Sequence, residues 1–390
     1  MKFNVKILLL FVLFAVVSSG GCGGSNSNSL SGLRDENERM IQAMTLEEKV
    51  AQLLVIRPEH LNTAMSIDAI HYTRTSADIE VNSVMLETLK KYPVGGFALF
   101  AQNIKSPEQL KKFTADLKNA CDIEPFMCID EEGGRVARLG NKAESFDIPR
   151  IGSMQSIGET GDTQNAYDAA YTIGGYLKDY GFNLDFAPVA DINTNPDNIV
   201  IGDRAFGSDP DLVSRMVSAF LEGLHAQGVM GTIKHFPGHG DTTSDTHTGY
   251  VAVYKTWDEL MQAELIPFID NIDLTDVIMP AHITLKNIIS EDVPATLSYE
   301  ILTEKLRGEL GYNGVIITDS LEMGAINNTW PSGEACVKAI EAGNDLLLVP
   351  YNYIQAFEAL LNAVRTGRIS EERINESLRR IFALKFREAK

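Results

Sequence analysis

The stretch "VMGTIKHFPGHGDTTSDTH", residues 229–247, has two parts of different composition, and the first ends at Phe236. Its first part is an apolar, β-branched run, which predicts a buried strand. Its second part contains Pro237, Gly238 and Gly240, which break regular structure. Residues 234–247 also hold three of the seven histidines of the chain. An apolar strand that runs into a polar loop is the unit from which the rest of the fold can be predicted.

The same unit recurs along the chain. Eight predicted strands occupy residues 52–57, 94–100, 126–131, 183–189, 229–236, 276–282, 314–320 and 345–350. Helical periodicity fills the intervals, with helix N-caps predicted at Thr45, Ser106 and Thr256. Eight strand–helix units without a break in composition predict an α/β fold with a single (β/α)8 TIM-barrel domain, and an open doubly wound sheet is the alternative. Residues 58–92 are an extension between the first two strands.

The N-terminus has the layout of an exported lipoprotein. Two lysines precede an apolar run at residues 7–17, which is short for a membrane span, and small residues lead to Cys22. Residues 1–22 are predicted to be a lipoprotein-type signal peptide with Cys22 as the lipidated residue, and residues 23–33 a flexible tether. A plain cleaved signal peptide is the alternative. Either way, residues 34–390 are expected outside the cytoplasm, in the periplasm or at the cell surface.

The net charge of the chain limits the classes of molecule that the folded domain is expected to bind. The formal net charge of −19 argues against binding of nucleic acid or anionic lipid by the folded domain, so membrane contact is expected only through the lipid anchor.

Besides Cys22 the chain has Cys121, Cys128 and Cys336, an odd number that suggests no disulfide framework. We predict that they are small buried hydrophobic residues, and a bridge between Cys121 and Cys128 is the less favoured alternative.

The unusual polar residues share a predicted position. Active sites of (β/α)8 barrels lie at the C-terminal ends of the strands and in the loops that follow. The residues predicted to lie there are Asp130 and Glu131 (third strand), Asp191 and Arg204 (fourth), Lys234 and His235 (fifth), His282 (sixth) and Asp319 (seventh). Each could instead cap a helix or pair with another charge, but their common position favours a site.

Asp245 and His247 stand two residues apart in the loop after the fifth strand. In an extended chain this spacing places both side chains on one side, so the carboxylate can orient the imidazole and raise its pKa. A metal site made of His235, His239, Asp241 and His247 is one alternative, although no compact metal-binding motif supports it. Solvated loop histidines are another. The favoured interpretation is a loop that transfers a proton.

A second carboxylate ends the predicted strand at residues 314–320. Asp319 follows the apolar run "VIIT" and precedes a segment that contains Gly324. A carboxylate at this end of a barrel strand can attack an electrophilic carbon while a partner protonates the leaving group. Alternatively, Asp319 caps the next helix, and Glu322 would point elsewhere if that segment is helical.

Taken together, these motifs resemble glycoside hydrolase family 3, and within it the NagZ-type β-N-acetylglucosaminidase (β-hexosaminidase) branch of bacterial cell-wall recycling. The motifs are "IDEEGGRVARL" (129–139), "IGDRAFG" (201–207), "KHFPGHGDTTSDTH" (234–247), "PATLS" (294–298) and "GVIITDSLEMGAI" (314–326). The resemblance spans nearly the whole chain beyond the tether. It implies a retaining exo-β-N-acetylglucosaminidase that acts on peptidoglycan fragments or other glycans through a covalent glycosyl-enzyme intermediate, without a metal or organic cofactor.

The resemblance also implies residue roles. Asp319 would be the nucleophile, His247 the general acid/base and Asp245 the residue that orients His247. The residues implied to bind the terminal sugar are Asp130, Arg138, Arg204, Lys234 and His235. A carbohydrate is then the expected partner, and the protein is expected to be a monomer.

Three other functions stay open. One is a family 3 β-glucosidase. Another is a β-glycoside phosphorylase, because a neutral histidine at the acid/base position would repel phosphate less than a carboxylate would. The third is a lipid-anchored sugar-binding protein without activity, since a fold does not guarantee function.

Overall fold

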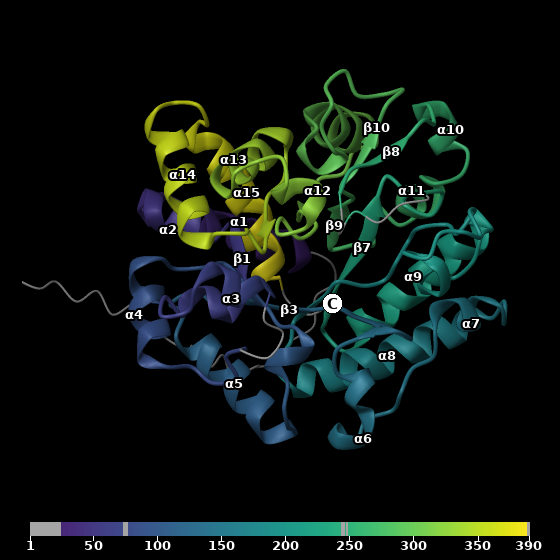
Figure 1. Ribbon diagram of the computed structural model, residues 1–390, viewed down its shortest axis with the longest axis horizontal. Coiled ribbons are helices and arrows are strands. Elements are labelled where there is room, and N and C mark those ends of the chain that lie inside the picture. The colour runs from purple at the N-terminus through teal and green to yellow at the C-terminus, as the bar shows by residue number, and fades with distance from the viewer. Residues whose placement is uncertain (1–24, 73–76, 243–245, 247–248, 388–390) are drawn as a thin grey trace, which may run out of the picture.

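The computed structural model of the protein describes residues 25–72, 77–242, 246 and 249–387. Its centre is an eight-stranded sheet, and the helices are arranged around it (Figure 1). The strands are β1 Leu54–Ile56, β2 Gly96–Ala98, β3 Phe126–Ile129, β6 Leu184–Asp185, β7 Met230–Phe236, β9 Val277–Pro280, β11 Val315–Ile316 and β12 Leu347–Leu348. Each lies inside one of the eight predicted segments, so the prediction of these strands is confirmed.

The strands neighbour one another in chain order. The order in the sheet is β11-β9-β7-β6-β3-β2-β1-β12, and the paired strands are parallel. An isolated parallel bridge between Ile317 and Leu346 joins the segments at the two ends of this order. An open doubly wound sheet would instead reverse its strand order at a switch point. The chain therefore has an α/β fold with a parallel, TIM-barrel-like sheet.

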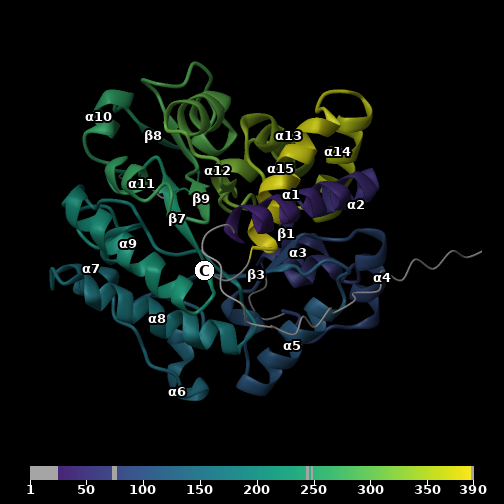
Figure 2. The same cartoon turned by 180° about the vertical axis from the view of Figure 1, so that it is seen from behind.

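The helices cover the outside of the sheet (Figures 1 and 2). They are α1 Ser25–Ala43, α2 Leu46–Ala51, α3 Ile67–Tyr72, α4 Ser83–Lys91, α5 Pro107–Asn119, α6 Ala143–Phe146, α7 Met154–Gly158, α8 Thr163–Asp179, α9 Pro210–Ala226, α10 Trp257–Met261, α11 Ile266–Asp270, α12 Gly324–Asn327, α13 Ser332–Ala342, α14 Tyr353–Arg365, α15 Glu371–Lys385 and the π-helix η6 Glu300–Glu309. The predicted caps are confirmed, because Thr45 and Thr256 form capping boxes and Ser106 accepts a hydrogen bond from Gln109 N.

The loops carry smaller elements that periodicity did not predict. An antiparallel pair joins β4 Glu131–Gly133 to β5 Val136–Ala137, and a parallel pair joins β8 Val251–Val253 to β10 Ile283–Leu285. The extension after β1 contains the 3-10 helix η1 Pro58–Leu61, then α3 and α4. Pairs of two or three residues are too short to leave a clear periodic signal in the sequence.

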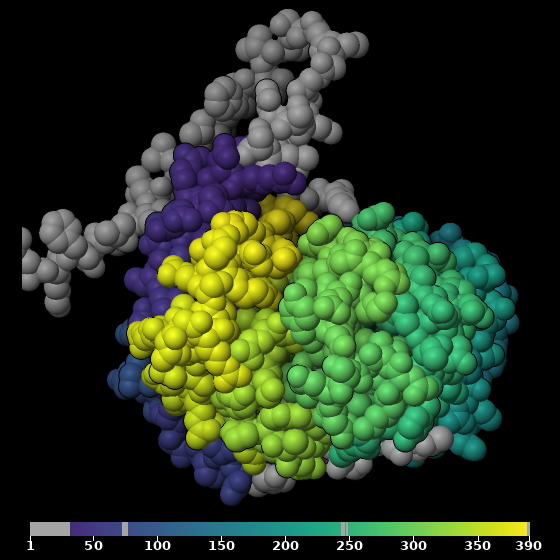
Figure 3. All heavy atoms as spheres, turned by 90° about the horizontal axis from the view of Figure 1, so that it is seen from above, coloured from purple at the N-terminus to yellow at the C-terminus, as the bar shows by residue number. Residues whose placement is uncertain are grey.

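The predicted tether is partly wrong. Residues 25–33 belong to α1, which continues without a break to Ala43. This helix packs on α15 through the ion pair between Glu38 and Arg379 (Nε–Oε2 2.8 Å), and Figure 3 shows the purple N-terminal part of the described chain against the yellow C-terminal part. Tertiary packing of this kind stabilises helix in a composition that suggests a coil. Residues 1–22, including Cys22, lie outside the described residues, and no described helix is long and apolar enough to cross a membrane.

The three cysteines within the described ranges are free. Cys128 and Cys336 are buried, as predicted, whereas Cys121 is only half-buried. The alternative of a bridge between Cys121 and Cys128 is therefore wrong. Cys121 lies in the loop after α5, and Cys128 lies inside β3.

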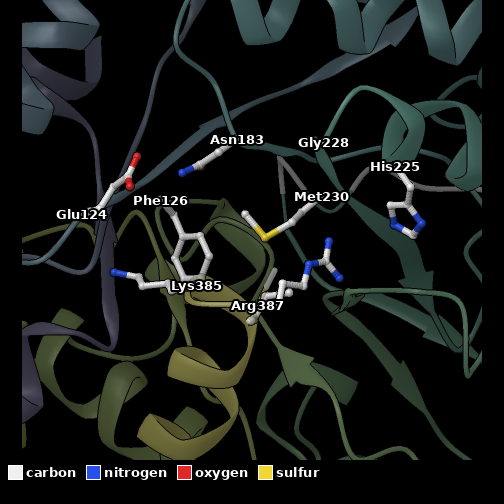
Figure 4. A pocket seen from close by; sticks show the side chains of 9 residues that line it. Glu124, Phe126, Asn183, His225, Gly228, Met230, Lys385 and Arg387 are labelled. Atoms are coloured by element: carbon white, nitrogen blue, oxygen red, sulfur yellow. The ribbon is translucent and has the colours of Figure 1, made fainter. Parts of the chain in front are cut away.

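A cavity of about 210 Å³ lies at the N-terminal ends of the strands, opposite the polar rim (Figure 4). Phe126 begins β3 and Met230 begins β7, and both line the cavity. Lys385 of α15 also lines it, with Nζ 4.8 Å from the centre of the Phe126 ring. That amine donates hydrogen bonds to the Gln52 side chain (3.0 Å) and to the Gly95 carbonyl (2.9 Å). Burial lowers the pKa of Lys385 from its ordinary 10.5 to about 7.

This lysine predicts how stability changes with pH. Between pH 7 and pH 10.5 the folded state binds fewer protons at Lys385 than the unfolded state does, so its contribution to the free energy of unfolding rises with pH. Lys385→Met is expected to flatten the rise, by at most about 1.4 kcal/mol per pH unit. Urea unfolding of both proteins near pH 7 and near pH 9 measures this difference. Equal slopes for the two proteins would contradict the prediction.

Candidate active site

The predicted polar residues come together at the C-terminal ends of the strands. Asp130 directly follows β3, Lys234 and His235 lie near the end of β7, and Asp319 lies three positions after β11. Parallel strands place their C-terminal ends at one edge of a sheet, so these side chains share one face of the molecule. The contacts between them divide the site into a charged cluster, a histidine pair and the segment around Asp319.

Lys234 is the centre of the charged cluster. Its side chain is only 3% exposed, and its Nζ lies 2.9 Å from Asp130 Oδ1 and 2.6 Å from Glu132 Oε1. Arg138 Nη2 donates to the other oxygen of Asp130 at 2.9 Å. Burial alone would raise the pKa of Asp130, but the charges of Lys234 and Arg138 hold it well below its usual range. Asp130 is therefore an ionised acceptor held in place by two cations.

Arg204 extends this cluster toward the histidines. Its Nε and Nη2 donate to the two oxygens of Glu132, each at 2.8 Å, in the fork geometry that suits a guanidinium. Burial opposes charge on Glu132, but Arg204 and Lys234 lower its pKa to about 2. Arg204 Nη2 also lies 3.4 Å from His235 Nε2. The guanidinium thus links a buried carboxylate to an imidazole of the site.

Glu132 was missed in the sequence, where Asp130 and Glu131 drew attention as the end of the strand. Glu131 is structural, because its carboxylate accepts hydrogen bonds from Leu139 N, Gly140 N and Tyr176 Oη. Burial raises the pKa of Glu131, in contrast to Glu132. The run "DEE" indicated that carboxylates lie at the end of this strand. The local sequence could not show which of them contacts Lys234 and Arg204.

Asp191 joins two histidines of the loop after β7. It is fully buried and accepts hydrogen bonds from His235 Nδ1 (2.6 Å) and from the backbone N–H of His239 (2.6 Å). The first bond assigns the ring proton of His235 to Nδ1, which leaves Nε2 to accept from Arg204. Burial would raise the pKa of Asp191, but His235 and His239 lower it. Asp191 was placed at the rim from the sequence without a role, and the structure makes it a positioning residue.

His239 is held neutral. Its Nδ1 lies 2.7 Å from Thr242 Oγ1, and its carbonyl accepts a hydrogen bond from Asn198 Nδ2 at 2.8 Å. Burial, assisted by the nearby His235, lowers the pKa of His239 to about 4. These contacts tie the start of the loop to the segment after β6.

Asp245 and His247, the predicted orienting residue and acid/base, lie outside the described residues. Thr246, which stands between them, is described and buried. Its carbonyl accepts a hydrogen bond from Ala325 N of α12 at 3.1 Å. The loop after β7 therefore contacts the helix that follows Asp319, which brings the two predicted catalytic segments together at Thr246.

Asp319 lies in a segment that is held by His282, two residues after the end of β9. Its Oδ1 accepts a hydrogen bond from Ser320 N at 2.7 Å, and the Ser320 carbonyl accepts from His282 Nε2 at 3.0 Å. Thr296, from the "PATLS" motif, lies 2.9 Å from His282 Nδ1. Helix α12 begins only at Gly324 and has no side-chain N-cap. The alternative that Asp319 caps the next helix is therefore wrong.

Gly240 offers a test of the loop's position. A Cβ at residue 240 would lie 1.7 Å from the carbonyl oxygen of Ile192, so Gly240→Ala must displace the loop or the Ile192 backbone. We expect destabilisation of about 1–3 kcal/mol and loss of most of the catalytic activity of the wild type. Gly249→Ala is the matched control, because a Cβ there meets nothing within 4 Å. Thermal unfolding and initial rates of both variants measure the effects, and equal behaviour would contradict the prediction.

Comparisons with known proteins find a family and several proteins that are similar to this chain. A family described as the glycosyl hydrolase family 3 N-terminal domain matches residues 45–384. Beta-hexosaminidase A of Pseudoalteromonas piscicida is 36% identical over 329 residues, and the match covers 77% of this chain and 54% of that protein. Beta-hexosaminidase of Idiomarina loihiensis is 34% identical over 300 residues, 76% of this chain and 89% of that protein.

A solved structure is similar over most of the chain. It is a glycoside hydrolase family 3 beta-N-acetylglucosaminidase from Paenibacillus sp. str. FPU-7, with 39% sequence identity and a TM-score of 0.79. The match covers 88% of this chain and 62% of that one. The chain thus spans little more than half of the Pseudoalteromonas relative and less than two thirds of the Paenibacillus protein.

Proposed function

Because the chain belongs to glycosyl hydrolase family 3, we propose that it is a retaining exo-β-N-acetylglucosaminidase that hydrolyses terminal β-linked N-acetylglucosamine. The observation that carries the proposal is Asp319 at the same end of the sheet as the cluster of Asp130, Lys234 and Glu132. A carboxylate nucleophile beside ionised donors and acceptors is suited to a neutral sugar with a reactive anomeric carbon. The names of the similar proteins support the choice of an N-acetylated sugar.

In this mechanism Asp319 attacks the anomeric carbon while His247, oriented by Asp245, protonates the leaving oxygen. The bond to the leaving group breaks, and a covalent glycosyl-enzyme forms. His247 then takes a proton from water, which attacks the anomeric carbon and releases Asp319 with net retention of configuration. Ser320 N stabilises the Asp319 carboxylate through its 2.7 Å hydrogen bond.

The sugar-binding roles follow from charge and geometry. Asp130 would accept hydrogen bonds from hydroxyl groups, since Lys234 and Arg138 keep it ionised. Lys234, Arg138 and Arg204 would donate to hydroxyl groups or to the N-acetyl carbonyl. His235 Nε2 would accept from a hydroxyl group in exchange for its 3.4 Å contact with Arg204 Nη2. The cluster needs no metal or organic cofactor for these roles.

We further propose that α1 and the residues that follow it form one (β/α)8 catalytic domain that acts as a monomer. The leader and Cys22 support export and lipid anchoring, in the periplasm or at the cell surface, where peptidoglycan fragments or other glycans are available. Cys22→Ser should then move the protein from the membrane fraction to the soluble fraction of the producing cell. An unchanged distribution would contradict the anchor.

The test of function is hydrolysis of 4-nitrophenyl β-N-acetylglucosaminide beside the matching β-glucoside, with the anomeric configuration of the first product followed by NMR. Turnover of the N-acetyl substrate to the β-anomer supports the proposal. Preference for the glucoside would make the protein a β-glucosidase. A sugar phosphate formed only when phosphate is added would make it a phosphorylase. Sugar binding without turnover would make it a binding protein.

A further inference from the structure

Glu322 lies on the same loop as Asp319, between β11 and α12. Residues 321–323 form a turn and not the start of a helix, since α12 begins at Gly324. The expectation that Glu322 points elsewhere depended on a helix at this position. Its side chain is 22% exposed, at the end of the sheet where the charged cluster lies.

Two cations from distant parts of the chain bind one oxygen of Glu322. His71 Nδ1 of α3 lies 2.6 Å from Glu322 Oε2, and Arg57 Nη1, directly after β1, lies 3.4 Å from the same oxygen. Burial would raise the pKa of Glu322, but the hydrogen bond from His71 and the charge of Arg57 lower it. Glu322 is therefore an ionised carboxylate with a fixed orientation.

His71 is itself clamped in place. Its Nε2 lies 2.7 Å from the Tyr351 carbonyl, and its ring stacks on the Tyr351 ring with centres 4.1 Å apart at 10°. A carbonyl and a carboxylate can only accept hydrogen bonds, so both ring nitrogens of His71 carry protons in this arrangement. An imidazolium held by the segment after β12 thus presents one N–H to Glu322.

The second oxygen of Glu322 is differently placed. Oε1 has no hydrogen-bond partner among the described residues, and it is not among the enclosed polar atoms. A carboxylate with one oxygen fixed by two cations and the other open is an oriented acceptor. The natural donor for such an acceptor beside a sugar site is a hydroxyl group.

The contacts around Glu322 extend to the charged cluster. The guanidinium of Arg57 lies 5.1 Å from the centre of the Phe100 ring, and that of Arg138 lies 5.7 Å from the same ring. Arg138 binds Asp130. Glu322 and Asp130 are therefore joined through two arginines that share one aromatic ring, on the side of the sheet formed by the ends of β1, β2 and β3.

On these contacts, and resting on the proposed function, we propose that Glu322 Oε1 binds a hydroxyl group of the carbohydrate substrate and that the extension at residues 58–92 holds Glu322 in place through His71. The hydroxyl can belong to the terminal sugar or to the leaving sugar. Glu322 would be a substrate-binding residue, and His71 a positioning residue that acts through it.

Glu322→Gln is the sharpest variant. If its amide oxygen remains on Arg57 and His71, the variant presents an N–H donor where the wild type presents an acceptor. We expect kcat/KM to fall about 10- to 100-fold, the range for a hydrogen bond to a charged group. Glu87→Gln, an exposed residue of α4, is the matched control and is expected to change kcat/KM by less than about twofold.

Two substrates distinguish the two hydroxyl sources. If Glu322→Gln slows an aryl β-N-acetylglucosaminide and the β-1,4-linked N-acetylglucosamine disaccharide equally, the hydroxyl is on the terminal sugar. If only the disaccharide is slowed, the hydroxyl is on the leaving sugar. Rates within about twofold of wild type on both substrates would overturn the proposal.

His71→Gln tests the positioning role. It should reduce kcat/KM in the same direction, and the double variant His71→Gln/Glu322→Gln should lose no more than Glu322→Gln alone, because both act through one contact. Additive losses of kcat/KM in the double variant would overturn the positioning role. A loss in His71→Gln that is explained entirely by a lower thermal unfolding temperature would also overturn it. If the wild type cleaves neither substrate, the proposed function fails by itself. Calorimetric binding of the disaccharide to wild type and Glu322→Gln then decides the role of Glu322, and equal affinity overturns it.

Discussion

Asp319→Ala is expected to lower kcat on an aryl β-N-acetylglucosaminide by roughly 10⁴- to 10⁶-fold, because the variant has no group that can form the covalent intermediate. The variant loses the hydrogen bond from Ser320 N to Asp319 Oδ1, but two other contacts of the segment do not involve the Asp319 side chain. The Ser320 carbonyl keeps its hydrogen bond from His282, and Thr296 stays beside His282. The loss should therefore be chemical, with little change in the thermal unfolding temperature.

Added azide should restore part of the rate of Asp319→Ala. The small anion can occupy the space of the lost carboxylate and attack the anomeric carbon, which would give a glycosyl azide of inverted configuration. NMR of the product distinguishes this azide from the sugar released by wild type. The control is Asp179→Ala, at the exposed end of α8. A residual rate in Asp319→Ala above about 10% of wild type would exclude Asp319 as the nucleophile.

Asp345→Ala is expected to reduce the free energy of unfolding by about 3–5 kcal/mol, the usual effect of breaking a buried ion pair from one side. Asp345 is fully buried before β12, with Oδ2 2.6 Å from Arg307 and Oδ1 2.9 Å from Arg380. Oδ2 also accepts a hydrogen bond from Ile316 N of β11 at 3.0 Å. The variant would leave two largely buried guanidinium groups without their carboxylate.

Urea unfolding measures this loss. The matched control is Glu341→Gln, which breaks a more exposed ion pair with Arg368 (2.8 Å) and is expected to change stability by less than about 1 kcal/mol. Since Asp345 lies at the end of the sheet opposite the site, the variant that remains folded should keep its kcat. A loss of stability no larger than that of the control would contradict the role of Asp345.

The sequence was sufficient to predict the strands because their signal is local. Each of the eight segments is a short apolar run between polar loops, and burial on both faces of a parallel sheet produces that pattern. The capping boxes at Thr45 and Thr256 were equally local, since Ncap and N3 residues meet within one turn. The prediction of a flexible tether failed at residues 25–33 because Ser, Asn and Gly suggest a coil. Helix α1 instead depends on contact with α15, from the other end of the chain.

The sequence predicted where the site residues lie, but it did not predict which of them contact one another. Asp130, Lys234, His235 and Asp319 were expected at one rim because strand ends converge there, and they lie there. Which groups touch depends on contacts between distant segments, such as Glu132 with Arg204 and Glu322 with His71. No periodic pattern encodes such pairs. The Asp245 and His247 pair stays a prediction, since it lies outside the described residues.

The double role of Asp191 limits how this protein can change. One carboxylate orients the ring of His235 and also holds the backbone of His239, where the loop toward residue 247 begins. A substitution at Asp191 would therefore alter the orientation of His235, which we propose binds the sugar, and the position of the His239 backbone together. Shifts in specificity along this lineage, natural or engineered, should come from residues that do not contact Asp191, while Asp191 is kept. Libraries that hold Asp191 constant should accordingly contain more active variants than libraries that vary it.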